Sequence, residues 1–299
     1  MGKAERNRRE SAREKIAAQQ AAARRAQVRR QVLLTAGSVA AVLVIVVAFI
    51  VINSFRHSSV AAAKSVATAE KQITSVPAST LNSVGKGTAT TMFPVTGAPP
   101  LTSQGKPEML YMGAEYCPYC AAERWAMTVA LSRFGTFSNL HFIHSSSTDV
   151  YANTPTLTFY KSSYTSKYLT FVPVEWYSGI PDSKSPTGYK VLQTPTAAQQ
   201  ALFSKYNAAP YVPAADAGAF PFVDIGNKYL VVGSQYVPTG FAGMTWGQIA
   251  TAAKDPSSAV AKDIDGAANS ITAAICKMTN NQPGSVCSSS AAQAGSGTL

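Results

Sequence analysis

Two cysteines two residues apart, Cys117 and Cys120, lie where a buried strand should end and a helix should begin, and this restricts the fold more than any other feature. Residues 107–113 form a short, mostly apolar run, which predicts a strand. After the pair, apolar residues recur at the spacing of one helix face, and Gly135 marks the expected end of that helix. The recurring residues are Ala122, Trp125, Ala126 and Val129. A strand, a CxxC pair and a helix in this order predict an α/β fold.

The helix start gives the two thiols different chemistry. Unsatisfied backbone N–H groups and the positive end of the helix dipole stabilise a thiolate at Cys117, which is therefore the expected nucleophile. Cys120, one turn further along, is placed to resolve a mixed disulfide on Cys117. An inert structural disulfide and half of a zinc site are the alternatives. Zinc needs two more ligands, and the other cysteines, Cys276 and Cys287, are spaced unlike a second zinc knuckle, so we expect no metal.

The residues around this pair resemble known redox proteins. Residues 106–120 look like the active-site turn of the thioredoxin superfamily, with a Pro-Tyr dipeptide typical of glutaredoxins. Pro221, followed by a hairpin with a Gly226-Asn227 turn signal, resembles the cis-proline strand of that superfamily. An ordinary proline at the start of a strand is the alternative reading. More narrowly, residues 113–126 resemble a membrane-anchored thioredoxin-like family described as domain of unknown function 929, over about residues 75 to 288.

The resemblance implies a thioredoxin-like fold: a central mixed sheet flanked by helices, with an insertion before the cis-proline strand. It implies that substrate would be held beside the thiols by Pro221, Phe220, Tyr116 and Tyr119.

The chain departs from that superfamily at one position. Tyr111 stands where the superfamily often has a buried acid, so the group that moves a proton to and from Cys120 is open. Glu108, Glu115 and Glu123 are candidates, and for each a solvated surface carboxylate is the alternative.

The N-terminal segment predicts where this chemistry takes place. Residues 32–52 form an uncharged apolar run long enough to cross a bilayer. Residues 1–31 hold ten Lys or Arg and three Glu, so +7 of the net charge of +11 lies in this tail. The positive-inside rule then predicts a single-pass cell-membrane protein with a cytoplasmic N-terminus and an extracytoplasmic C-terminal domain. A cleaved signal peptide is the alternative. Membrane lipid accounts for the basic tail, and we expect no nucleic-acid partner.

Composition divides the rest of the chain. We expect a stalk and linker over 53–105, the thioredoxin-like domain over 106–288, and a disordered tail over 289–299. A short edge strand is expected at 92–95. Residues 140–144 read as the second central strand of a βαβ unit, with His141 and His144 not metal ligands. The tyrosine-rich insertion over 148–219 predicts added strands and a helix at 196–206, and two helices are expected within 246–276.

Two functions fit these features. The first is a membrane-anchored thiol–disulfide oxidoreductase, which would act on thiols or disulfides of exported proteins through its CPYC site and exchange electrons with an unidentified membrane partner. Such exchange needs no cofactor. The second is a non-catalytic binding or assembly module on a thioredoxin-like scaffold. Cys276 and Cys287 are expected to form a structural disulfide, with a redox relay as the alternative.

Overall fold

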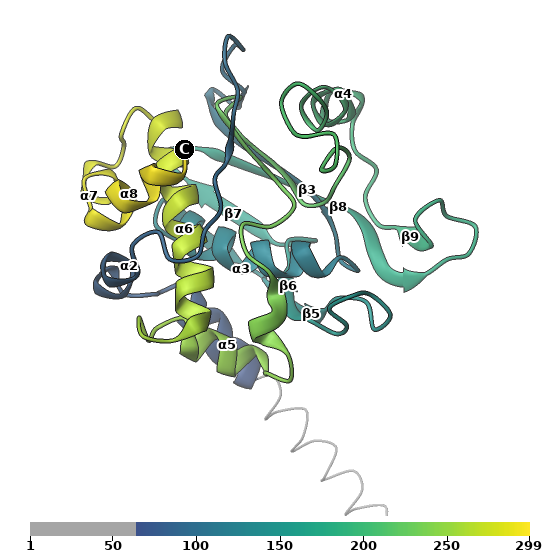
Figure 1. The fold of residues 1–299 in the computed structure, drawn as a ribbon, viewed down its shortest axis with the longest axis horizontal. Coiled ribbons are helices and arrows are strands. Elements are labelled where there is room, and N and C mark those ends of the chain that lie inside the picture. Colours follow the sequence, from purple (N-terminus) through teal and green to yellow (C-terminus); the bar gives the residue numbers. More distant parts are fainter. Residues whose placement is uncertain (1–63) are drawn as a thin grey trace, which may run out of the picture. The chain divides into compact units, whose positions relative to one another are not determined.

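A computed structural model describes residues 64–299, and its centre is a mixed β-sheet (Figure 1). The middle strand, β3 (Lys106–Ala114), runs parallel to β8 (Thr170–Pro181) and antiparallel to β10 (Phe222–Ile225). The remaining strands are β11 (Tyr229–Val232) and β1 (Phe93–Pro94) beyond β10, β9 (Tyr189–Val191) beyond β8, and β2 (Thr102–Ser103) against the start of β3. The strands expected at 107–113 and 92–95 are thus present, the second one at an edge of the sheet.

Helices cover both faces of this sheet. Met109 and Tyr111 of β3 belong to the core beneath α3 (Pro118–Ser132) and α6 (Ala259–Met278). Leu110 and Met112, which point the other way, belong to a second core with the half-buried Leu202 and Phe203 of α4 (Ala197–Tyr206). The shorter helices are α2 (Ala78–Val84), α5 (Trp246–Ala252), α7 (Gly284–Cys287) and α8 (Ser290–Gly295), with 3₁₀ turns η1 (Pro238–Phe241) and η2 (Ser296–Thr298). The mixed α/β class and the helices expected at 196–206 and within 246–276 are confirmed.

Two small sheets lie outside the central one. β4 (Gly135–Ser138) pairs with β7 (Ser163–Ser166), and β5 (His141–His144) pairs with β6 (Pro155–Thr158). The prediction that 140–144 is the second central strand is therefore wrong, because β8 takes that place. His141 and His144 are exposed at the two ends of β5, and such polar ends do not suit a strand that is covered on both faces.

Two predicted boundaries are also wrong. Within the expected stalk and linker, 53–105, the part that the structure describes packs into the domain, since Ile73, Leu81 and Met92 are buried. The expected disordered tail, 289–299, forms α8 and η2 and buries Ala291 and Ala292. The basic tail at 1–31 and the apolar run at 32–52 lie outside the described residues. Among residues 64–299, no helix is long and apolar enough to span a membrane.

Candidate active site

Cys117 is the N-cap residue of α3, and Pro118 occupies the first helical position. The Sγ atom of Cys117 accepts a hydrogen bond from the backbone N–H of Cys120 at 3.2 Å. Proline suits this position because its missing N–H would have no partner within the helix. Cys117 keeps 7 % of its surface exposed and Cys120 none, and neither is in a disulfide. Only Cys117 is therefore open to a partner molecule.

The surroundings shift the pKa values of the two thiols in opposite directions. Hydrogen bonds from the thiol and the backbone N–H of Cys120 lower the pKa of Cys117, and the charge of Arg124 adds to this, although burial opposes it. Burial and the nearby Cys117 raise the pKa of Cys120 well above its ordinary value. A thiolate is the nucleophilic form of cysteine. Of the two thiols, Cys117 is therefore the one that more readily forms a thiolate, and Cys120 is the one that keeps its proton.

A cis peptide bond faces the thiols from the start of β10. The bond between Phe220 and Pro221 is cis, and the carbonyl oxygen of Phe220 lies 3.8 Å from the Cys117 Sγ. Pairing of β10 with β3 brings this segment to the end of β3 that leads into Cys117, with Phe222 opposite Met112. The expected cis-proline and its hairpin, which turns at Gly226, are confirmed.

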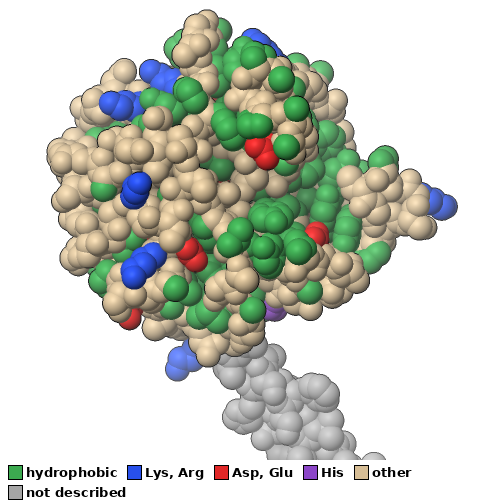
Figure 2. All heavy atoms as spheres, viewed as in Figure 1, with side chains coloured by type: hydrophobic (Ala, Val, Ile, Leu, Met, Phe, Trp, Pro, Cys, Tyr) green, Lys and Arg blue, Asp and Glu red, His purple; other side chains and the backbone are tan. Residues whose placement is uncertain are grey.

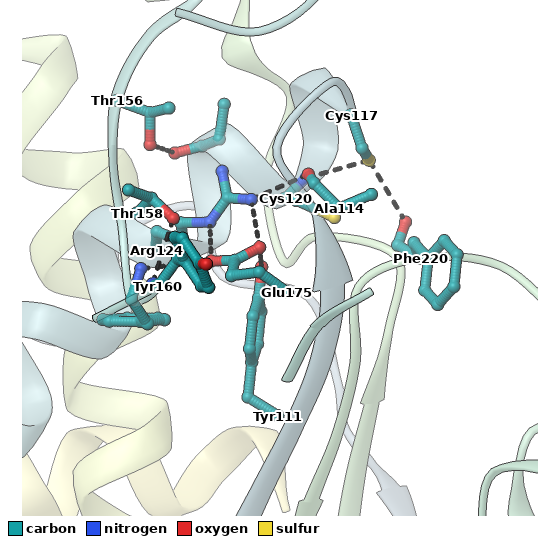
Figure 3. A network of polar contacts seen from close by, with 12 residues as sticks. Tyr111, Ala114, Cys117, Cys120, Arg124, Thr156, Thr158, Tyr160, Glu175 and Phe220 are labelled. Atoms are coloured by element: carbon teal, nitrogen blue, oxygen red, sulfur yellow. Dashed lines mark hydrogen bonds and ion pairs between the residues drawn. The ribbon is translucent and has the colours of Figure 1, made fainter. Parts of the chain in front are cut away.

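A buried ion pair lies behind the thiols (Figure 3). The guanidinium of Arg124, on α3, donates from Nε and Nη2 to the two carboxylate oxygens of Glu175, on β8, at 2.8 and 2.7 Å. Nη2 also donates to the carbonyl of Ala114 at 2.7 Å, which accepts the backbone N–H of Cys117 as well. Both charged side chains are fully buried. The pair therefore ties together the strand, the turn and the helix that place Cys117.

The carboxylate of Glu175 has two further donors. The hydroxyl of Tyr111 lies 3.4 Å from one oxygen, and the backbone N–H of Phe159 donates to the other at 3.2 Å. The sequence shows Tyr111 in place of a buried acid, and the structure places an acid from the neighbouring strand beside it. Sequence reasoning missed both Arg124 and Glu175. The sequence carried no signal for Arg124, because on the predicted helix it falls on the side opposite to the apolar face, where a solvated charge is expected.

Half-buried aromatic side chains surround the thiols and form what we call the aromatic rim: Tyr116, Tyr119, Tyr177 and Phe220. Tyr116 stacks on Tyr189 of β9, with ring centroids 4.1 Å apart, and Tyr119 meets Tyr151 edge-on at 5.6 Å. Hydrophobic side chains gather right of centre on the face shown in Figure 2. All four residues predicted to hold substrate (Pro221, Phe220, Tyr116 and Tyr119) thus lie around Cys117, whereas Tyr189 was not foreseen.

The three glutamates considered for proton transfer differ in their surroundings. Glu123 is fully buried, accepts the backbone N–H of Gln235 at 3.0 Å, and has its pKa raised to about 7 by burial. Burial also raises the pKa of Glu108 and of Glu115. No hydrogen bond joins any of these three carboxylates to a thiol. Across residues 64–299, no three His, Cys, Asp or Glu side chains gather as a metal site.

The other two cysteines are bonded to each other. Cys276, near the end of α6, and Cys287, at the end of α7, form a disulfide with their Cα atoms 5.6 Å apart. The predicted pairing is confirmed.

Comparison with known proteins adds one match. A family model described as "Domain of unknown function (DUF929)" matches residues 93–277, which include the two thiols, the ion pair and the cis-proline. No curated protein and no solved structure matches the chain.

Proposed function

We propose that this chain, which belongs to the family described as domain of unknown function DUF929, is a thiol–disulfide oxidoreductase with a thioredoxin-like fold. The observation that carries the proposal is the asymmetry of the two thiols. Cys117 is a helix N-cap with a lowered pKa and some exposure, whereas Cys120 is buried with a raised pKa. A structural disulfide does not require such a difference. Thiol–disulfide exchange does, because one sulfur must attack the substrate as a thiolate while the other stays protonated until the mixed disulfide has formed.

In the reducing direction, the Cys117 thiolate attacks one sulfur of a substrate disulfide. The substrate S–S bond breaks, a mixed disulfide forms, and the other substrate sulfur leaves as a thiolate that takes up a proton. Cys120 then loses its proton and attacks the Cys117 sulfur. The second substrate sulfur is released, and a Cys117–Cys120 disulfide remains. The substrate gains two electrons and the protein loses two, and the oxidising direction runs through the same steps in reverse.

The ion pair supports the second step. Deprotonation of a fully buried thiol is costly, and the charge of Arg124 lowers the pKa of Cys120 against that cost. Glu175 holds the guanidinium by two hydrogen bonds and so fixes where this charge lies. Arg124 is therefore a positioning and electrostatic residue, and the sulfurs carry the reaction.

The surroundings of Cys117 suit an extended chain as substrate. The cis Phe220–Pro221 segment turns a backbone carbonyl towards the reactive sulfur, and the aromatic rim offers apolar contacts on either side. A strand–CxxC–helix unit with a cis-proline opposite is also the arrangement that supports a thioredoxin-like fold. We propose exported proteins as substrates, because the apolar run at 32–52 and the basic tail before it predict a membrane anchor with this domain outside.

The test is exchange by the full chain in a maltoside detergent. We expect it to reduce insulin disulfides in the presence of a thiol reductant. Cys117→Ser should abolish this turnover, and Cys120→Ser should accumulate a mixed disulfide on Cys117 that non-reducing gels and mass spectrometry detect. Equilibration in thiol buffers then gives the reduction potential, and with it the direction. A pair that never exchanges with the buffer would leave the binding or assembly module as the better reading.

A further inference from the structure

A cavity lies at the end of α3 opposite to Cys117. Its volume is about 280 Å³, and its walls come from the end of α3, the segment that leads into α2, and the α7–α8 region. These elements gather on one side of the molecule (Figure 1). Its polar lining residues are Thr74, Ser132, Arg133, Ser285 and Ser289, and its apolar ones are Val76, Ala78, Leu81, Val129 and Val286.

The guanidinium of Arg133 has donors to spare in this cavity. Nη2 donates to the Ser289 hydroxyl at 2.9 Å, and Nη1 has a long contact of 3.5 Å with the Asn269 side-chain oxygen. Arginine has five N–H donors. Within residues 64–299 the other three, including the N–H on Nε, have no acceptor. A planar fork with free donors is the geometry that binds a carboxylate or a phosphate through two parallel hydrogen bonds.

The charge of Arg133 also lacks a partner. Among the described residues no carboxylate forms an ion pair with it, and burial alone lowers its pKa to about 10. The buried Arg124 shows the contrast, because Glu175 neutralises it. Arg133 is the C-cap residue of α3, so the negative end of the helix dipole offsets part of its charge, and an anion in the cavity would offset the rest.

The rest of the lining favours an organic anion over an inorganic one. Five of the ten lining residues are apolar, so an inorganic anion, which has only charged oxygens on its surface, would leave half of the wall without an apolar contact. The volume is slightly below the 300–1,000 Å³ or so of common ligand sites, which limits the ligand to a short apolar body. The negative end of the α3 dipole opposes an anion here. It is weakened because the Ala130 and Leu131 carbonyls already accept hydrogen bonds, the latter from the Tyr164 hydroxyl.

We propose that this cavity binds the carboxylate of a small apolar organic acid, with Arg133 as the anion-binding residue. Val129, Leu81 and Val286 would hold the apolar body. The carboxylate has two possible sources, a free acid or the C-terminus of a peptide, and both present the same group to Arg133. This site is separate from the thiols, and its existence does not depend on the proposed redox activity.

The test uses the full chain in maltoside detergent and ligand-observed NMR titrations with butyrate, butyramide, inorganic phosphate and an N-acetylated dipeptide with a free carboxylate. We expect saturable binding of butyrate, and binding of butyramide weaker by about tenfold or more, because the charge-assisted hydrogen bonds are lost. Tighter binding of the dipeptide would identify a peptide C-terminus as the source. Binding of phosphate alone, or equal binding of butyramide, would overturn the proposal.

Three variants on the cavity wall separate binding from folding. Ser285 is exposed and lies on α7, so its replacement leaves the core intact. Ser285→Glu supplies a carboxylate from the protein, and we expect it to abolish butyrate binding and to raise Tm in a salt-sensitive way. Ser285→Gln is the matched control and should retain binding. Two results would overturn the proposal. In the first, Arg133→Gln binds butyrate as well as the natural chain does. In the second, the natural chain binds no carboxylate and Arg133→Gln only lowers Tm, which would mean that Arg133 only joins α3 to α8 through its hydrogen bond with Ser289.

Discussion

The Glu175→Gln substitution should separate the structural role of the buried ion pair from its effect on the thiols. The change removes the charge that Arg124 requires and places an amide N–H₂ against the N–H donors of the guanidinium. Glu175 accepts two hydrogen bonds from Arg124, at 2.8 and 2.7 Å, and neither side chain is exposed. Breaking a buried pair from one side costs about 3–5 kcal/mol, because an uncompensated charge stays buried.

That loss is large relative to the stability of a domain, which is about 5–15 kcal/mol in total. For a domain of this size it corresponds to a fall in Tm of about 6–20 °C. We would measure unfolding of the full chain in urea by tryptophan fluorescence, with Arg124→Met/Glu175→Leu as the matched variant. Replacing both partners by apolar residues leaves no charge unpaired, so most of the stability should return.

The thiols provide the second readout of the same experiment. The double variant lacks the cation that lowers the pKa of both cysteines, so the pH at which Cys117 is half-alkylated should rise even where the fold is restored. A loss below about 1 kcal/mol in Glu175→Gln would refute the reasoning, since exposed pairs give such values. So would a double variant that is as unstable as the single one, or one that leaves the alkylation profile unchanged.

Four further predictions concern single features of the fold. Alkylation of Cys117 should reach half its maximal rate below the pH of about 8.5 expected of a free cysteine. Burial raises the pKa of Asp265 to about 8, so this carboxyl ionises at a lower pH in the unfolded chain than in the folded one, and the free energy of unfolding should fall as pH rises from about 4 to 8. In urea melts, Asp265→Asn should be as stable as the natural chain at pH 4 and more stable at pH 8, by up to about 5 kcal/mol. Replacing Cys276 and Cys287 with serine should lower the free energy of unfolding by about 3 kcal/mol, and an unchanged rate of insulin reduction by the other pair would exclude a relay. Gly266→Ala should destabilise by about 1–3 kcal/mol despite its better helix propensity, because the added Cβ would lie 2.6 Å from the Lys86 carbonyl; a neutral result in urea melts would contradict that contact.

The parts of the site that sequence could predict are those that local chemistry determines. Proline suits the first position of a helix whatever precedes it, and Pro118 takes that position with Cys117 as the N-cap residue. A Gly226-Asn227 pair between two apolar runs gives a hairpin, and that hairpin brings Pro221 towards the thiols through β10. Each of these features depends on only a few neighbouring residues.

The choice of the second central strand depends on the burial of both faces. Residues 141–144 have histidine at each end, and these ends are exposed in β5. Residues 171–174 are an uninterrupted apolar run, in which Phe171 packs against the α3 side and Val174 against the α4 side. A parallel strand at the centre of a sheet is covered on both faces and reads as such a run. The apolar run at 171–174 was therefore a usable signal for the central strand. Residues 140–144 were chosen instead because they follow the CxxC helix directly in the sequence.

The tail shows why composition can mislead. Residues 289–299 are rich in Ser, Ala and Gly, which is typical of disorder. Here small size allows α8 to approach α6 closely: a Cβ on Gly295 would lie 2.1 Å from the Asn269 carbonyl. Ala291 and Ala292 are buried in the same contact region. Small residues are typical both of close helix–helix contacts and of flexible chains. Composition alone cannot tell these two cases apart, because the difference lies in whether a partner helix is present.

Tyr111 is the residue whose meaning changes most between sequence and structure. In the sequence, it stands where the superfamily that the chain resembles often has a buried acid. In the fold its hydroxyl lies 3.4 Å from Glu175, and a Cβ on Gly113, two residues along the same face, would lie 2.1 Å from that hydroxyl. Glycine therefore makes the space in which the phenol reaches the carboxylate. A second acid at position 111 would bury two like charges beside a single Arg124, so a carboxylate supplied by β8 excludes one from β3. The buried carboxylate behind the thiols comes from β8, and a neutral phenol at position 111 is compatible with it where a second acid is not.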